Sequence, residues 1–69
     1  MSEATTGTRD STYDLISVAY HALQGADNCD TYERDAEGDQ ELRSFFHEAQ
    51  QKQRELADRA KTLLSRQLS

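Results

Sequence analysis

The 69-residue sequence has no proline and no tryptophan, only three glycines and only one cysteine. It also lacks a long apolar run, so no segment is expected to cross a membrane as a helix of about 20 residues. Because Cys29 has no second cysteine to pair with, a small domain stapled by internal disulfides is excluded. Without proline, nothing forces a break in a long helix. These absences favour one small helical domain.

Cys29 lies on the apolar side of the first expected helix, which predicts a buried small side chain. An unpaired thiol fits a reducing compartment. The polar residues 1–10 contain no apolar segment typical of a secretory signal. We therefore expect a cytoplasmic protein.

Acidic side chains outnumber basic ones by thirteen to eight, which gives a net charge of −5. Nucleic-acid binding needs a basic surface, and anionic membrane surfaces attract faces rich in Lys and Arg. Neither nucleic acid nor membrane is therefore expected as a partner. The excess lies in residues 11–37, with six acids and one base, whereas residues 39–69 have five acids and six bases.

Apolar residues recur at helical spacing in two segments. We expect helices over about 12–36 and 40–67, joined by a turn at 37–39. Residues 1–10 are small and polar and are expected to be disordered. The predicted fold class is therefore all-α, an antiparallel two-helix hairpin over residues 11–69.

Local signals fit these helix ends. Ser11 followed by Asp14 resembles a capping box in which Asp replaces Glu. Gly38 suits the left-handed residue that follows a helix, and Asp39 is a good N-cap for the second helix.

Each expected helix has an apolar stripe. The first contains Leu15, Ile16, Ala19, Ala22, Leu23, Ala26 and Cys29, and the second contains Leu42, Phe45, Phe46, Ala49, Leu56, Ala60, Leu63 and Leu64. Two helices cannot enclose a core, and chains this short bury little surface, so the stripes need a partner. We predict a homodimer that forms a four-helix bundle, with higher assemblies or another protein partner left open. The predicted dimer interface contains Leu15, Ile16, Ala19, Leu23, Leu42, Phe45, Phe46, Ala49, Leu56, Ala60 and Leu63.

Two residues in these helices have alternative interpretations. Gln53 falls inside the second stripe, either as a half-exposed edge position or as a buried polar residue that fixes the register between chains. Gly25 costs about 1 kcal/mol relative to Ala in a helix interior. It is either compensated by a close helix contact or simply tolerated.

Catalytic chemistry is not expected. The sequence has no Gly-rich phosphate loop, no Cys/His pair at ligand spacing and no evident Ser/His/Asp set. His21 and His47 lie beside apolar stripes and are interpreted as packed or exposed side chains rather than ligands. The acidic run at 35–41 does not match an EF-hand loop. Turn formation and capping explain it, adventitious cation binding is left open, and no cofactor is expected.

Two segments resemble the hairpin helices of ferritin-like or rubrerythrin-like proteins. Residues 41–48 and 54–58 are similar to the second helix of such a hairpin, and residues 21–24 are similar to the first. The likeness covers residues 13–66. Its shape is that of half-length members such as encapsulated ferritins, in which two hairpins pair into one four-helix bundle, and it implies the same assembly here.

The metal ligands of that family are not matched. Its members use a Glu from the first helix and a Glu-x-x-His from the second. The resemblance puts the second-helix pair at Gln53 and Leu56. It puts the first-helix Glu at Leu23, or at Ala22 if the turn differs by one residue. The main hypothesis is therefore a non-catalytic assembly module. The alternative is a di-iron type metal-binding protein with a site formed across the dimer by Asp30, Glu33, Glu48 or Glu55.

Overall fold

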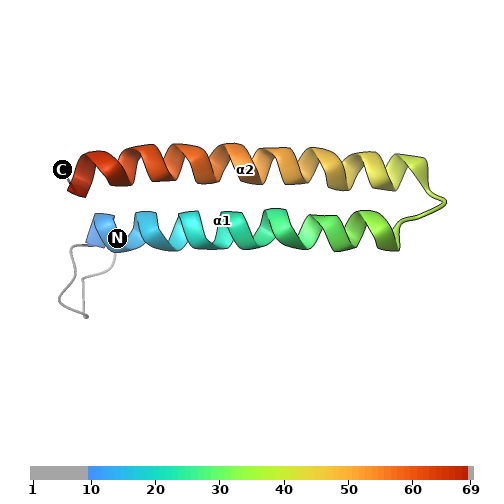
Figure 1. Ribbon diagram of the computed structural model, residues 1–69, viewed down its shortest axis with the longest axis horizontal. Helices are drawn as coiled ribbons and strands as arrows, with labels where there is room; N and C mark the ends of the chain where they lie inside the picture. Colours follow the sequence, from blue (N-terminus) through green and yellow to red (C-terminus); the bar gives the residue numbers. More distant parts are fainter. Residues whose placement is uncertain (1–9, 69) are drawn as a thin grey trace.

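The computed structural model describes residues 10–68 as two helices, α1 (Asp10–Asp35) and α2 (Gln40–Leu68), with no strand in that range. The helices lie side by side and antiparallel, so the chain is one long hairpin (Figure 1). The predicted all-helical hairpin is confirmed. The predicted dimer involves a second chain and stays a prediction. Of the predicted disordered tail, residues 1–9 lie outside the described range.

The open end of the hairpin differs from the expected capping box. Helix α1 already includes Asp10, so Ser11 is inside the helix. Its hydroxyl oxygen accepts a hydrogen bond from Nε2 of Gln67 at 2.9 Å. Ser11 therefore links the first turn of α1 to the last turn of α2.

The turn forms as its residues predict. Gly38 has a φ of 95°, in the left-handed region that favours glycine. Oδ1 of Asp39 accepts a hydrogen bond from the backbone N–H of Leu42 at 3.1 Å, which satisfies one unpaired donor of the first turn of α2. The backbone N–H of Asp39 in turn donates to the carbonyl of Ala36 at 2.9 Å. The chain reverses within a few residues because both ends of the turn are capped.

The contact between the helices, which we call the seam, is built mainly from small side chains. Its residues are buried or half-buried at alternating spacings of three and four: Leu15, Ala19, Ala22, Ala26, Cys29 and Glu33 on α1, Ala36 just after α1, and Phe46, Gln50, Gln53, Ala57, Ala60 and Leu64 on α2. This spacing is that of left-handed, coiled-coil-like packing. The buried apolar side chains among them are alanines and one cysteine.

Most of the large apolar side chains lie outside the seam, which contains only Leu15, Phe46 and Leu64. Those that are exposed are Tyr13, Ile16, Val18, Tyr20, Leu23, Tyr32, Leu42, Phe45, Leu56, Leu63 and Leu68. No large side chain within the described range is fully buried. The radius of gyration is 15.3 Å, against about 11 Å for a compact domain of this length. In a single hairpin these side chains remain in contact with water. Burying them would add stabilisation, because the hydrophobic free energy scales with the apolar area removed from water.

Gly25 lies close to a side chain of α2. A Cβ atom at this position would lie 3.1 Å from Cδ of Gln53. The close-contact interpretation of Gly25 is therefore confirmed, because the missing side chain leaves room for the amide group of α2. Gln53 itself is half-buried at the edge of the seam, which matches the first of its two interpretations.

We expect Asp39→Ala to lower the free energy of unfolding by about 0.5–2 kcal/mol, the usual effect of removing an N-cap oxygen. Asp39→Asn keeps an acceptor oxygen and should retain most of the stability. Urea denaturation at one fixed chain concentration measures both variants. Equal losses in the two variants would show that the cap contributes nothing.

Candidate functional site

The hairpin has two long flanks, one on each side of the plane that contains the two helix axes. On one side of the hairpin, the row that borders the seam holds the residues just before Ala19, Ala26 and Glu33 of α1 and just before Gln50, Ala57 and Leu64 of α2. On the other side, the bordering row holds the residues just after Leu15, Ala22 and Cys29 of α1 and just after Phe46, Gln53 and Ala60 of α2. In an antiparallel pair, the "before" rows of both helices share one side of the hairpin, and the "after" rows share the opposite side. Cross-helix contacts between Gly25 and Gln53 and between Tyr32 and Phe46 fix the register of these rows.

In the first flank, which we call the uncharged flank, the two rows that border the seam carry no Asp, Glu, His, Lys or Arg, whereas the next rows outward contain Asp14, His21, Asp35, Lys52, Arg59 and Arg66. The two bordering rows consist of Ser11, Val18, Gly25 and Tyr32 from α1 and Leu42, Ala49, Leu56 and Leu63 from α2. The register interleaves the two rows along the hairpin axis. At the open end, the two rows meet in a shallow hollow lined by Ser11, Leu15, Leu63, Arg66 and Gln67. Phe45 extends the flank at the turn end, with its ring 5.7 Å from the ring of Phe46.

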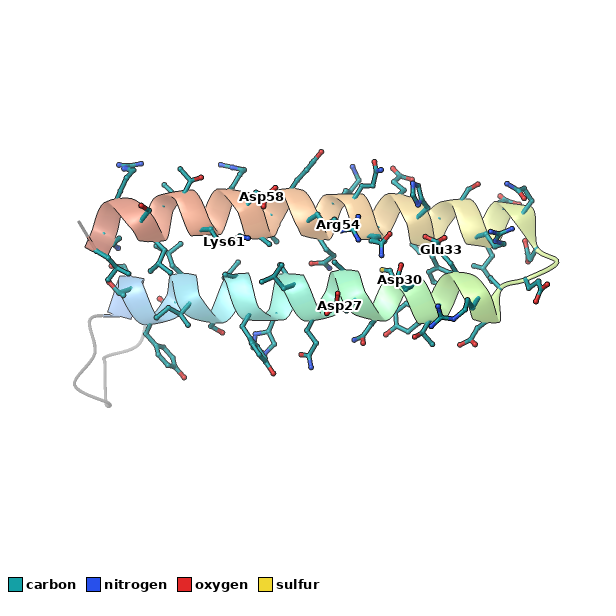
Figure 2. All side chains as sticks on the ribbon, in the orientation of Figure 1. Asp27, Asp30, Glu33, Arg54, Asp58 and Lys61 are labelled. Carbon is teal, nitrogen blue, oxygen red and sulfur yellow. The ribbon has the colours of Figure 1, made fainter. Side chains whose placement is uncertain are left out.

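The opposite flank, which we call the charged flank, carries both signs of charge. It consists of Ile16, Leu23 and Asp30 from α1, Glu37 from the turn, and His47, Arg54, Lys61 and Leu68 from α2. Figure 2 shows the labelled charges of the two helices, with Asp30 on α1 and Arg54 and Lys61 on α2. This flank is suited to contact with water because half of its positions or more can be ionised.

The eleven residues of the predicted dimer interface fall into three places. Leu15, Ala19, Phe46 and Ala60 lie in the seam within one chain. Leu42, Phe45, Ala49, Leu56 and Leu63 lie on or beside the uncharged flank, and Ile16 and Leu23 lie on the charged flank. The second group is the largest of the three and lies on one side of the hairpin.

Gln50 is the buried polar residue of the seam, and the sequence analysis did not single it out. Its Nε2 donates to the backbone carbonyl of Ala26 at 2.8 Å and to Oδ1 of Asp30 at 2.7 Å. The side chain is 4% exposed. Its spacing from Phe46 and Ala57 places it in the seam, which is the signal that could have identified it. The two bonds tie α2 to α1 at one defined register.

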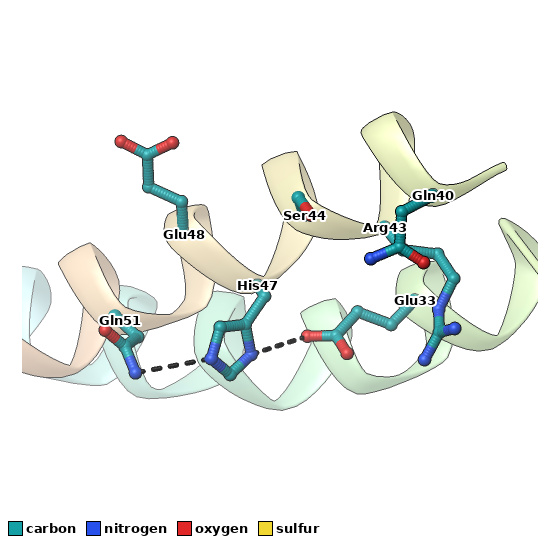
Figure 3. Close-up of a pocket in the computed structure, with 7 residues that line it drawn as sticks. All are labelled: Glu33, Gln40, Arg43, Ser44, His47, Glu48 and Gln51. Atoms are coloured by element: carbon teal, nitrogen blue, oxygen red, sulfur yellow. Dashed lines mark hydrogen bonds and ion pairs between the residues drawn. The ribbon is translucent and has the colours of Figure 1, made fainter.

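The exposed polar groups near the turn form ordinary surface contacts. Nδ1 of His47 lies 3.2 Å from Oε2 of Glu33, and Nε2 of Gln51 lies 3.4 Å from the other ring nitrogen of His47 (Figure 3). The His47 side chain is 59% exposed, so this pair contributes little to stability. His21 instead bonds within its own helix, with Nδ1 2.9 Å from the carbonyl oxygen of Ser17. Both histidines are surface side chains.

The positions that the family resemblance assigns to metal ligands do not converge within one hairpin. Leu23 lies on the charged flank and Leu56 on the uncharged flank, so the seam separates them. Ala22 and Gln53 lie in the seam. Within residues 10–68, no group of three or more His, Cys, Asp or Glu side chains is placed to hold a metal ion.

Cys29 is a seam residue and is 5% exposed, as predicted for a small buried side chain. Burial raises the pKa of its thiol, and the carboxylates of Glu33 and Asp30 raise that pKa further. A thiol with a raised pKa is a poor nucleophile at neutral pH because the thiolate is the reactive form. Cys29 is therefore a structural residue of the seam.

Comparisons with protein-family models, curated proteins and solved structures found no match to this chain. Neither described helix has a stretch apolar enough to cross a bilayer. The arrangement of side chains must therefore support any functional proposal, and its most distinctive part is the uncharged flank.

Gln50→Ala should lower the free energy of unfolding by about 1–3 kcal/mol, because it removes two hydrogen bonds, one of them to a carboxylate. Gln51→Ala is the matched control, since it removes the same side chain from an exposed neighbouring position. It should change stability by less than about 0.5 kcal/mol. Thermal or urea unfolding of the two variants measures the difference, and equal stabilities would refute the structural role of Gln50.

Proposed function

We propose that this chain is a non-catalytic helical assembly module. Two hairpins pair through their uncharged flanks and form a homodimeric four-helix bundle. The observation that carries this proposal is the row of Val18, Tyr32, Leu42, Leu56 and Leu63, all 37–47% exposed and free of charged neighbours within the row. Soluble monomers rarely leave a continuous apolar surface of this length in water.

The size of the flank suits a second copy of the chain. The hairpin measures 48 × 23 × 16 Å, so its broad face matches the area of about 800 Å² per partner that a standard interface buries. Burying a Leu or Phe fully contributes on the order of 1.5–3 kcal/mol. A two-fold contact buries each flank residue in both chains, so its contribution counts twice. The summed contributions offset an association cost of about 4–15 kcal/mol.

The second copy is a fitting partner because the flank is complementary to itself. An isologous two-fold contact requires the same patch on both chains. The small residues Ala49 and Gly25 lie together near the middle of this flank, between larger residues toward each end, so the centre of one copy has room for larger side chains of the other. The resulting bundle has the architecture expected from the resemblance to half-length ferritin-like hairpins, and membership of that family is part of the proposal.

Leu56→Glu tests the proposed interface, and Leu23→Glu is its matched control. The two leucines are 47% and 43% exposed, but they lie on opposite flanks. A charge at Leu56 should raise the dimer dissociation constant at least about hundredfold, because the two-fold contact contains the lost burial twice. Leu23→Glu should leave it within a few-fold. Sedimentation velocity over a concentration series measures both.

Two outcomes of this experiment would overturn the proposal. The first is a folded monomer of the unaltered protein at micromolar concentration. The second is a dimer that Leu23→Glu dissociates and Leu56→Glu does not, which would place the interface on the charged flank. Dimers formed only together with a different protein chain would contradict the homodimer.

Metal content separates this proposal from the di-iron alternative. Protein purified without chelator should contain no stoichiometric iron or manganese, since neutral and apolar side chains stand at Gln53, Leu56 and Leu23. Fe(II) should not raise the melting temperature. About two metal ions per dimer, or a melting temperature that Fe(II) raises and chelator restores, would show a site formed between chains and would contradict the assembly-only function.

A further inference from the structure

The two ends of the hairpin differ in charge. The half next to the turn, residues 25–53, has eight acidic and three basic side chains and a net charge of −5. The half next to the open end, residues 10–24 and 54–68, has four acidic and four basic side chains and is neutral. The hairpin is elongated (Figure 1). Its turn end is therefore strongly acidic and its open end neutral.

Two hairpins stacked flank to flank have two symmetric arrangements. If the two-fold axis runs along the hairpin, the turns of both chains lie at the same end, and α1 stacks on α2 of the partner subunit. If the axis crosses the hairpin, the turns lie at opposite ends, and each helix stacks on its own copy. Both arrangements bury the same flank, so apolar burial alone does not choose between them.

We propose that the two hairpins of the two-fold dimer run in opposite directions, an orientation that we call head-to-tail. The turns then lie at opposite ends, and α2 stacks on α2 of the partner subunit. This inference rests on the proposed dimer and adds its orientation. With the turns together, two ends of net charge −5 would lie about one helix spacing, 8–10 Å, apart. That distance is close to the Debye length of about 8 Å at physiological salt, so the repulsion is only partly screened. Head-to-tail pairing puts each acidic end beside a neutral one.

The pattern of the uncharged flank fits this orientation. Gly25 and Ala49 lie near the middle of the hairpin, where the crossing axis would pass. With the axis there, Leu42 meets Leu63 of the partner subunit, and Val18 meets Tyr32 of the partner subunit. The two hairpins can approach closely at their centre because Gly25 and Ala49 are the smallest residues of the flank.

Disulfide trapping distinguishes the orientations. Every variant carries Cys29→Ala, so each chain has a single thiol. Leu42→Cys and Leu63→Cys chains are mixed, equilibrated and oxidised, and the mixed disulfide is quantified by intact mass. In parallel, Tyr32→Cys chains are mixed with Ala49→Cys chains, a pair that meets only when the turns lie together. Sedimentation of each variant before oxidation establishes that it is a dimer under these conditions.

The head-to-tail dimer predicts at least tenfold more of the 42–63 mixed disulfide than of the 32–49 one. With the turns together, positions 42 and 63 of the two chains would be about 31 Å apart along the axis, too far for a disulfide. A dominant 32–49 product would therefore overturn the orientation and leave the dimer standing. A dimer that traps neither pair would overturn both the orientation and the flank. A monomer would overturn the proposed function itself.

A spin label at the exposed turn-end position, Glu41→Cys in the Cys29→Ala chain, gives a measurement that leaves the flank unaltered. The head-to-tail dimer predicts a separation of about 35 Å or more between the two labels, given a rise of 1.5 Å per residue. Turns at the same end predict about 20 Å, two helix diameters. The shorter distance would overturn the head-to-tail orientation.

Discussion

The close contact between small side chains at the seam is the constraint on which the rest of the structure depends. Ala22 and Ala26 of α1 and Ala57 and Ala60 of α2 are all buried between the helices, so the two helices can approach closely. Because closely packed helices leave little room between them, most of the large side chains lie outside the seam. In many hairpins, Leu and Phe fill the seam. Here the seam fixes the shape with small groups, and the side chains with the largest burial energy stay available to a partner.

The seam also gives the hairpin two chemically different sides. Gln50 sets the register by bonding to Ala26 and Asp30, and that register interleaves the two uncharged rows along their full length. A register shifted by one heptad would keep the same rows on each side but displace them by about 10 Å along the axis, so that they would no longer overlap at the ends of the hairpin. The buried polar contact therefore contributes specificity, a role known for single polar residues in coiled-coil seams. The glycine at position 25 supports the same register by admitting the Gln53 side chain.

Much of the fold could be predicted from the sequence because its signals are local. Gly38 and Asp39 define the turn through their own backbone and side-chain chemistry, and two uninterrupted helical segments leave few alternatives to a hairpin. The division of the apolar residues could not be predicted. Leu56, which belongs to the predicted stripe, and Ala57, which does not, are neighbours in the chain, and only the packing against α1 decides which of them faces the seam. The larger residue, Leu56, was expected to be buried because of its size. In the structure Ala57 is the buried one, because helices that approach closely leave room only for the smaller side chain.

The contrast between the flanks also bears on how far assembly proceeds. A two-fold contact consumes the same surface on both chains, so a dimer formed through the uncharged flank has none of that surface left to offer a third chain. The outer faces of such a dimer are the charged flanks, where Asp30, Arg54 and Lys61 interrupt the apolar residues. Interspersed charges of both signs oppose further apolar association. The same distribution of side chains that favours pairing therefore favours a closed dimer over an open filament.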